Sequence, residues 1–76
     1  MGFVERLPFD WAGALILEDT RENYGERRFQ ALGLIGARLH MLVFTPRPDS
    51  VRIISLRKAN RREVSRYEQA SRPRKN

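Results

Sequence analysis

Three short apolar runs, separated by residues typical of turns, constrain the fold of this chain more than any other feature. The runs cover residues 28–34, 39–45 and 51–56. Runs of this length with β-branched and aromatic residues are typical of strands, and Gly and Pro between them are typical of turns. The middle run is apolar at both alternating sets of positions, which predicts a central strand covered on two sides. The short connections favour an antiparallel meander.

The segments before and after these runs add one strand and one helix to the prediction. Residues 14–17 are apolar and are followed by a polar loop, which indicates a fourth short strand. After Asn60 the apolar period changes, so that Val64 and Tyr67 lie on one helical face. Asn60 and Glu63 match a capping box, the pattern of a helix start. We therefore expect an α+β fold, with an antiparallel sheet of three to four strands followed by a C-terminal helix.

A chain of 76 residues has room for a single domain, residues 1–76, with one small core. We expect residues 1–10 to form an irregular N-terminus and residues 72–76 to form a basic, frayed tail. Trp11 is expected to pack in the core, whereas a base-stacking role stays open for Tyr24 in its polar loop. Because so small a core is marginal, we also expect a homodimer or a stabilising partner.

The positive charge of the chain is concentrated in its second half. Lys and Arg total 15 against 9 Asp and Glu, which gives a net charge of +6. Residues 1–38 hold five basic and six acidic residues, net −1, whereas residues 39–76 hold ten basic and three acidic residues, net +7. This asymmetry predicts a polyanionic partner such as RNA, since phosphate contacts supply most of the affinity for nucleic acids. The alternative is a basic surface that only keeps the protein in solution.

Several chemistries are excluded by what the sequence lacks. Cysteine is absent and histidine occurs once, so a disulfide, a thiolate nucleophile and a multi-histidine zinc site are excluded. No apolar run approaches the length of a membrane span, and the first residues do not match a leader peptide. We expect a cytoplasmic protein that uses no metal and no cofactor and does not bind membranes.

The most informative stretch for function is RIISLRK, residues 52–58. In a regular strand Arg52 and Arg57 point to opposite faces, whereas a bulge would place both on one face, and the pattern leaves this open. An arginine on an open sheet face can bind phosphate and stabilise the charge that develops in phosphoryl transfer. The competing interpretation is that each arginine only forms an ion pair, with Glu26 or Glu63 as the partner.

Two residues are candidates for proton transfer. His40 has the side chain most often used as an acid or base near neutral pH, although a lone His beside an apolar run is more often only packed. Glu26 stands at the mouth of a strand beside two arginines, where a base or a plain salt bridge would fit. Further RNA contacts are expected from neighbouring basic residues: Arg28, Lys58, Arg61 and Arg62.

Four segments of the chain resemble the BrnT family of toxins, the ribonuclease halves of type II toxin–antitoxin pairs. They are YGERRF at residues 24–29, LG at 32–33, LVFT at 42–45 and RIISLRKANRRE at 52–63. The resemblance covers about residues 9–68, and the last segment, with its Arg-Ile-Ile-Ser-x-Arg-x-Ala-x-x-x-Glu pattern, is the specific part. The other three segments support it.

The resemblance implies a RelE-like fold, a small antiparallel sheet flanked by helices with basic residues on an RNA-binding face. It implies RNA cleavage without a metal ion, arrest of translation, and neutralisation by a BrnA-like ribbon-helix-helix antitoxin. That antitoxin carries the DNA-binding domain, so the toxin would reach DNA only through it. Carried over to matching positions, Arg52 and Arg57 are the first candidates for RNA contact or catalysis, and Arg28 and Glu26 are the next.

The resemblance to the family is incomplete in one respect. Members of the family usually begin with an N-terminal helix that has a Trp-Asp start and a Lys-His-Gly segment, and we expect this chain to lack it. That segment would supply basic and imidazole groups to the RNA-binding face. The alternative function is therefore a non-catalytic module that binds RNA or an antitoxin, including a degenerate toxin.

Overall fold

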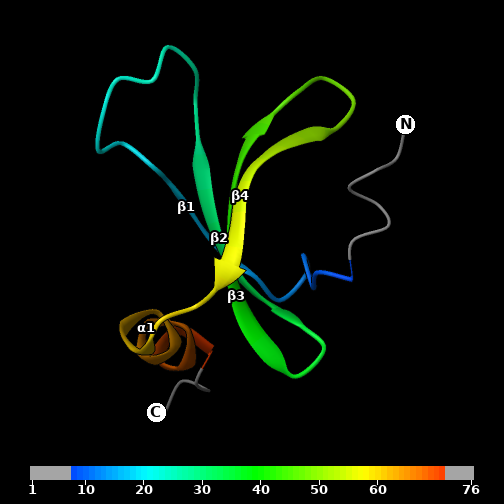
Figure 1. Ribbon diagram of the computed structural model, residues 1–76, viewed down its shortest axis with the longest axis vertical. Coiled ribbons are helices and arrows are strands. Elements are labelled where there is room, and N and C mark those ends of the chain that lie inside the picture. Colours follow the sequence, from blue (N-terminus) through cyan, green and yellow to red (C-terminus); the bar gives the residue numbers. More distant parts are fainter. Residues whose placement is uncertain (1–7, 72–76) are drawn as a thin grey trace, which may run out of the picture.

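The computed structural model describes residues 8–71, which form one four-stranded sheet and one helix (Figure 1). Each strand pairs antiparallel with the next along the chain, in the order β1-β2-β3-β4. The elements are β1 Leu15–Glu18, β2 Phe29–Ile35, β3 Arg38–Pro46, β4 Val51–Lys58 and α1 Arg61–Ser71. The predicted α+β fold and the predicted meander are confirmed.

Two parts of the prediction concern the ends of the chain. Residues 72–76, for which a basic tail is expected, lie outside the described residues, and so do residues 1–7 of the expected irregular N-terminus. The single domain over residues 1–76 stays a prediction. Within the part of the chain that the structure describes, no helix has the length and apolar character needed to cross a membrane.

The turn between β2 and β3 explains one glycine of the sequence. Ile35 pairs with Arg38, so two residues, Gly36 and Ala37, make the turn. Gly36 has a φ of 64°, in the left-handed region. A positive φ at the first of two turn residues is typical of the turns whose twist matches that of antiparallel strands.

The central strand β3 is buried on both faces, as its sequence predicts. Leu39 and Met41 point to one face, and Leu42 and Phe44 point to the other, and all four side chains are buried. The two faces belong to two separate apolar clusters. We call them the helix face, which α1 covers in part, and the aromatic face, which the segment before β1 covers.

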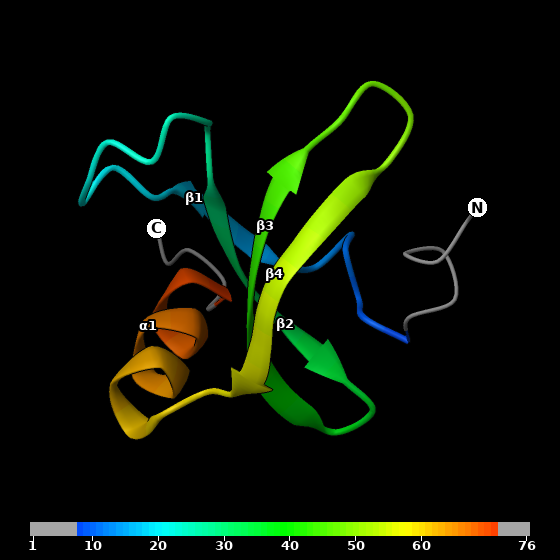
Figure 2. The same ribbon diagram turned by 45° about the horizontal axis from the view of Figure 1, so that its top comes forward.

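On the helix face, α1 packs its apolar side against the sheet. Val64 and Tyr67, the two residues predicted on one helical face, pack against the cluster that contains Leu32 and Met41. Figure 2 shows α1 beside one end of the sheet, with the β3–β4 hairpin extending beyond it. The helix therefore leaves part of its own face of the sheet uncovered.

The capping box predicted at the helix start is present. The Asn60 side chain accepts a hydrogen bond from the Glu63 backbone N–H at 2.8 Å, and the Glu63 carboxylate accepts one from the Asn60 backbone N–H at 2.9 Å. Two backbone donors of the first turn are satisfied in this way. Glu63 is consequently buried at the junction of the helix and the sheet.

On the aromatic face, the segment before β1 closes the core. Phe9 forms a single bridge with Ile35, and its ring lies over Gly33 so closely that a β carbon there would stand 2.6 Å from Cζ of the ring. Trp11 packs edge-on against Phe9 and Phe44, with ring centroids 4.9 and 5.3 Å away. The predicted core role of Trp11 is confirmed, and Gly33 is explained by the close approach of the Phe9 ring.

Candidate nucleic-acid interface

A β-bulge in β4 decides which way the side chains of that strand point. Val43 lies opposite Ser55, and the next residue of β3, Phe44, lies opposite Ile53. Ile54 is therefore an extra residue without a partner of its own on β3. Residues five positions apart point to opposite faces of a regular strand, and one extra residue between them reverses this.

The bulge brings Arg52 and Arg57 to the same face of the sheet. Arg52 lies opposite Thr45 and Arg57 lies opposite Met41, and residues directly opposite one another share a face. Since Met41 belongs to the cluster under α1, both arginines lie on the helix face. The question that the sequence pattern left open is answered by this register shift.

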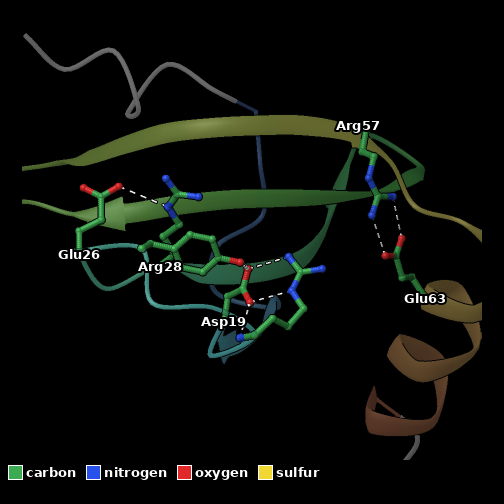
Figure 3. A network of polar contacts seen from close by, with 7 residues as sticks. Asp19, Glu26, Arg28, Arg57 and Glu63 are labelled. Atoms are coloured by element: carbon green, nitrogen blue, oxygen red, sulfur yellow. Dashed lines mark hydrogen bonds and ion pairs between the residues drawn. The ribbon is translucent and has the colours of Figure 1, made fainter.

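Arg57 forms a two-pronged ion pair with Glu63. Its two terminal nitrogens, Nη1 and Nη2, each donate to one carboxylate oxygen at 2.9 Å (Figure 3). The Arg57 side chain is 53% exposed, whereas that of Glu63 is only 10% exposed. The Arg57 hydrogen bonds hold the pKa of the Glu63 carboxyl below its ordinary value despite burial, and the same pair raises the pKa of Arg57.

At the other end of the same face, Glu26 joins two arginines. One carboxylate oxygen of Glu26, Oε2, accepts from Nε of Arg28 at 3.3 Å and from Nη2 of Arg52 at 3.1 Å. The Arg28 guanidinium lies 4.1 Å from the centre of the Tyr24 ring, within the range of a cation–π contact. Tyr24, whose role the sequence left open, thus helps to hold Arg28 in place.

Beside Tyr24, the sequence interpretation missed Asp19 and Arg21. The Asp19 carboxylate is almost fully buried and accepts from Nε and Nη2 of Arg21 at 2.8 and 2.7 Å and from the Tyr24 hydroxyl at 3.3 Å. The Arg21 hydrogen bonds hold the pKa of Asp19 well below its ordinary range. An acidic residue directly after a strand, followed two positions later by an arginine, is the signal that points to this turn.

A groove of about 580 Å³ lies on the helix face between the Asp19–Arg21 pair and the Arg57–Glu63 pair. The middle of the sheet lines it with Gln30, Met41, Val43 and Ser55. The start of the β1–β2 loop borders it on one side, and Arg57, Glu63 and Arg66 border it on the other. The groove is therefore an uncovered strip of sheet whose margins carry three guanidinium groups and three carboxylates.

The structure places the remaining sequence candidates elsewhere. His40 and Lys58 lie opposite each other on the aromatic face, away from Arg52 and Arg57. Nδ1 of His40 is 3.0 Å from the Arg38 carbonyl oxygen. Two further candidates, Arg61 and Arg62, are exposed on the first turn of α1.

The two interpretations of Arg52 and Arg57 both find support in this geometry. Each arginine pairs with a carboxylate, Arg52 with Glu26 and Arg57 with Glu63, as the structural alternative expected. Yet the Arg52 and Arg57 side chains stay 52% and 53% exposed, so neither pair removes its guanidinium from solvent. Among residues 8–71, no three His, Asp or Glu side chains gather into a group that would hold a metal ion.

A known protein family matches most of the chain. The family described as "Ribonuclease toxin, BrnT, of type II toxin-antitoxin system" matches residues 3–63. No match was found among curated proteins or among solved structures. The matched segment is 61 of the 76 residues and takes in the whole sheet, both charged ends of the helix face and the first turn of α1. The chain therefore belongs to the BrnT family, the ribonuclease toxins of type II toxin–antitoxin systems.

Proposed function

We propose that this chain is an endoribonuclease that cleaves RNA without a metal ion, and that its RNA-binding surface is the helix face of the sheet. The observation that carries the proposal is the bulge at Ile54. It places Arg52 and Arg57 on one face, at the two ends of β4, with an open groove between α1 and the β1–β2 loop. Two exposed guanidinium groups along one strip of sheet suit the spaced charges of a ribose–phosphate chain.

In the proposed reaction, the 2′-hydroxyl of one ribose attacks the neighbouring phosphate. A bond forms between the 2′-oxygen and phosphorus, and the bond from phosphorus to the 5′-oxygen of the next nucleotide breaks. Arg52, which lies beside Glu26, stabilises the negative charge that grows on the oxygens of this phosphate, and Arg57, at the far end of β4, binds another phosphate of the same strand and so holds the reacting bond in place. The leaving 5′-oxygen takes a proton from water.

Glu26 is the proposed base that accepts the proton of the 2′-hydroxyl. Both of its arginine partners donate to Oε2. Among residues 8–71, no donor bonds its other oxygen, Oε1, which is the atom proposed to accept the proton. His40 was the other candidate, and its place on the aromatic face favours Glu26 for this role.

The proposal extends to the cellular setting of a BrnT toxin. RNA cleavage would inhibit translation in the cytoplasm, and a BrnA-like antitoxin would neutralise the toxin and carry the only DNA contact of the complex. Arg28, Arg61 and Arg62 are proposed to add phosphate contacts. Lys58 lies on the aromatic face, which leaves it outside this surface. A homodimer remains part of the proposal, because the core is small.

Two neighbouring residues, Arg57 and Lys58, provide a matched test. They carry the same charge next to each other on β4 but point to opposite faces of the sheet. We expect Arg57→Ala to cleave a mixed-sequence RNA about 100-fold more slowly in the presence of a chelator, and Lys58→Ala to stay within about threefold of the wild type. The measurement is the rate of RNA cleavage by purified protein.

The control for this test addresses stability. Arg57→Ala leaves the buried Glu63 without its main partner, so the double variant Arg57→Ala/Glu63→Gln is prepared to relieve the unpaired charge. If the double variant is as stable as the wild type and still inactive, the loss is chemical. Equal activity of Arg57→Ala and the wild type would remove Arg57 from the reaction.

A second candidate function is a module that binds RNA or an antitoxin without cleaving RNA. The observation in its favour is that Glu26 and Glu63 neutralise both key arginines in the absence of RNA. Harmless expression of the protein, together with RNA binding that weakens steeply with salt and without cleavage, would favour this module over the nuclease.

A further inference from the structure

Glu63 serves two parts of the fold at once. Its carboxylate accepts the Asn60 backbone N–H that closes the capping box, and the same carboxylate holds both terminal nitrogens of Arg57. Both side chains border the groove, but that of Glu63 is only 10% exposed, whereas that of Arg57 is 53% exposed. The position of the Arg57 guanidinium is therefore tied to the rigid start of α1.

The hydrogen bonds of Arg57 leave one edge of its guanidinium open. Nη1 donates to Glu63 and to the Lys58 carbonyl oxygen, which accounts for both of its hydrogens, and Nη2 donates one hydrogen to Glu63. Among residues 8–71, no acceptor bonds Nε or the second hydrogen of Nη2. These two hydrogens lie on one side of the planar group, where they match two oxygens of a phosphate.

The groove that Arg57 lines has room for part of a nucleic-acid chain. Its volume of about 580 Å³ is within the range of pockets that take small ligands. Arg66 stands on the same margin as Arg57 and Glu63, so two guanidinium groups against one carboxylate leave this margin with a net charge of +1, which suits an anion. Leu17, on the opposite margin, is an apolar side chain left 46% exposed, which suits the flat face of a base.

We propose that Glu63 is a positioning residue, which holds Arg57 so that its Nε edge receives one phosphate group of an RNA strand in the groove. The inference deepens the proposed function, because it names the donor atoms that contact the phosphate and the residue that orients them. The opposite arrangement would be a competition in which Glu63 withholds Arg57 from RNA. The two arrangements predict effects of opposite sign when the Glu63 carboxylate is removed.

The test uses Glu63→Gln with Asn60→Ala as its matched control. Gln at this position still serves a capping box but loses the charge and one of the two oxygens that Arg57 uses. Asn60→Ala removes the side-chain cap and leaves the Arg57–Glu63 pair intact. The probe is a single-stranded RNA of mixed sequence with 2′-O-methyl groups, which the proposed reaction cannot cleave.

Two measurements are made on the folded proteins. The first is the dissociation constant of the probe, which we expect to rise about tenfold in Glu63→Gln and to stay within about twofold of the wild type in Asn60→Ala. The second is the ¹⁵N NMR signal of the Arg57 Nε–H group. We expect it to shift on addition of the probe to the wild type and to Asn60→Ala, and to shift little in Glu63→Gln.

Two outcomes would overturn the inference. Tighter binding by Glu63→Gln would show that Glu63 competes with the phosphate, and equal weakening in both variants would show that the effect is only structural. Failure of the proposed function has a different signature. If the wild type binds the probe through Arg57 Nε but does not cleave unmodified RNA, the positioning role stands and the nuclease is rejected.

Discussion

The two faces of the sheet are made by alternating residues of the same strands, yet they differ in chemistry. The aromatic face packs rings against each other, with Phe29 and Phe44 stacked 5.6 Å apart and Trp11 edge-on to Phe44. The helix face is apolar beneath α1, and at the start of the helix and beyond it this face also carries carboxylates and guanidinium groups.

The two faces of this small sheet also differ in how they are covered. Within residues 8–71, the short segment before β1 covers part of the aromatic face, whereas α1 covers one end of the helix face and leaves the other end open (Figure 2). The open part is where the charged residues gather. The predictions below test whether the aromatic face serves stability and the helix face serves RNA.

The largest expected effect is a loss of stability caused by a substitution on the aromatic face. Leu42 is fully buried, so Leu42→Ala is expected to lower the free energy of unfolding by about 2–4 kcal/mol, through lost burial and the cavity left behind. RNA binding per folded molecule is expected to stay unchanged. Unfolding in urea measures the first quantity, and titration with RNA below the transition measures the second.

The matched control for this prediction is Leu56→Ala. Leu56 lies directly opposite Leu42 on the same face but is 41% exposed, so its truncation should cost about 1 kcal/mol or less. A loss of RNA affinity in folded Leu42→Ala would contradict the division of roles between the two faces.

An effect of intermediate size is expected on the stability of the fold at low pH. The helix face should lose its structure first. The pKa values of Asp19 and Glu63 are lowered from ordinary values of 3.8 and 4.5 by Arg21 and Arg57. The unfolded chain then binds more protons than the folded one, so these pairs stabilise the fold fully above the ordinary values and lose their contribution as the pH falls below about 4.

Two spectroscopic signals separate the faces in this experiment. Circular dichroism at 222 nm reports α1, and the fluorescence of Trp11, the single tryptophan, reports the aromatic face. During acid titration we expect the helix signal to decline at a higher pH than the Trp11 signal. Coincident transitions would indicate that both faces unfold together.

The smallest effect is expected for His40→Ala. Because His40 lies on the aromatic face, its removal should leave the rate of RNA cleavage within about twofold of the wild type. Cleavage of a mixed-sequence RNA by the purified variant checks this expectation. A cleavage rate about 100-fold below that of the wild type, as expected for loss of a general acid or base, would contradict this expectation. It would show that His40 takes part in the reaction and that RNA contacts both faces of the sheet.

Much of the architecture could be predicted because it depends on neighbouring residues. The three apolar runs became β2, β3 and β4, and the Asn60–Glu63 capping box set the start of α1, as local hydrogen bonds and periodicity require. Trp11 and Tyr67 pack in the core, as their residue type favours.

The candidate site could be predicted only in part. The RIISLRK stretch pointed to Arg52 and Arg57, and Glu26 and Glu63 were named as partners for an ion pair. The Asp19–Arg21 pair was missed, because a charged loop looks alike whether its carboxylate is buried or solvated. His40 and Lys58 lie apart from the two arginines because alternation along a strand sends neighbours to opposite faces.

The sequence by itself determined the order of strands, the helix start and the family, because each depends on residue types at short spacing. Only the tertiary structure decided that Arg52 and Arg57 share a face. That outcome depends on one unpaired residue, Ile54, and a bulge arises from the register between two strands rather than from the composition of either. The same register places Arg57 within reach of Glu63, which joins the candidate RNA site to the start of the helix.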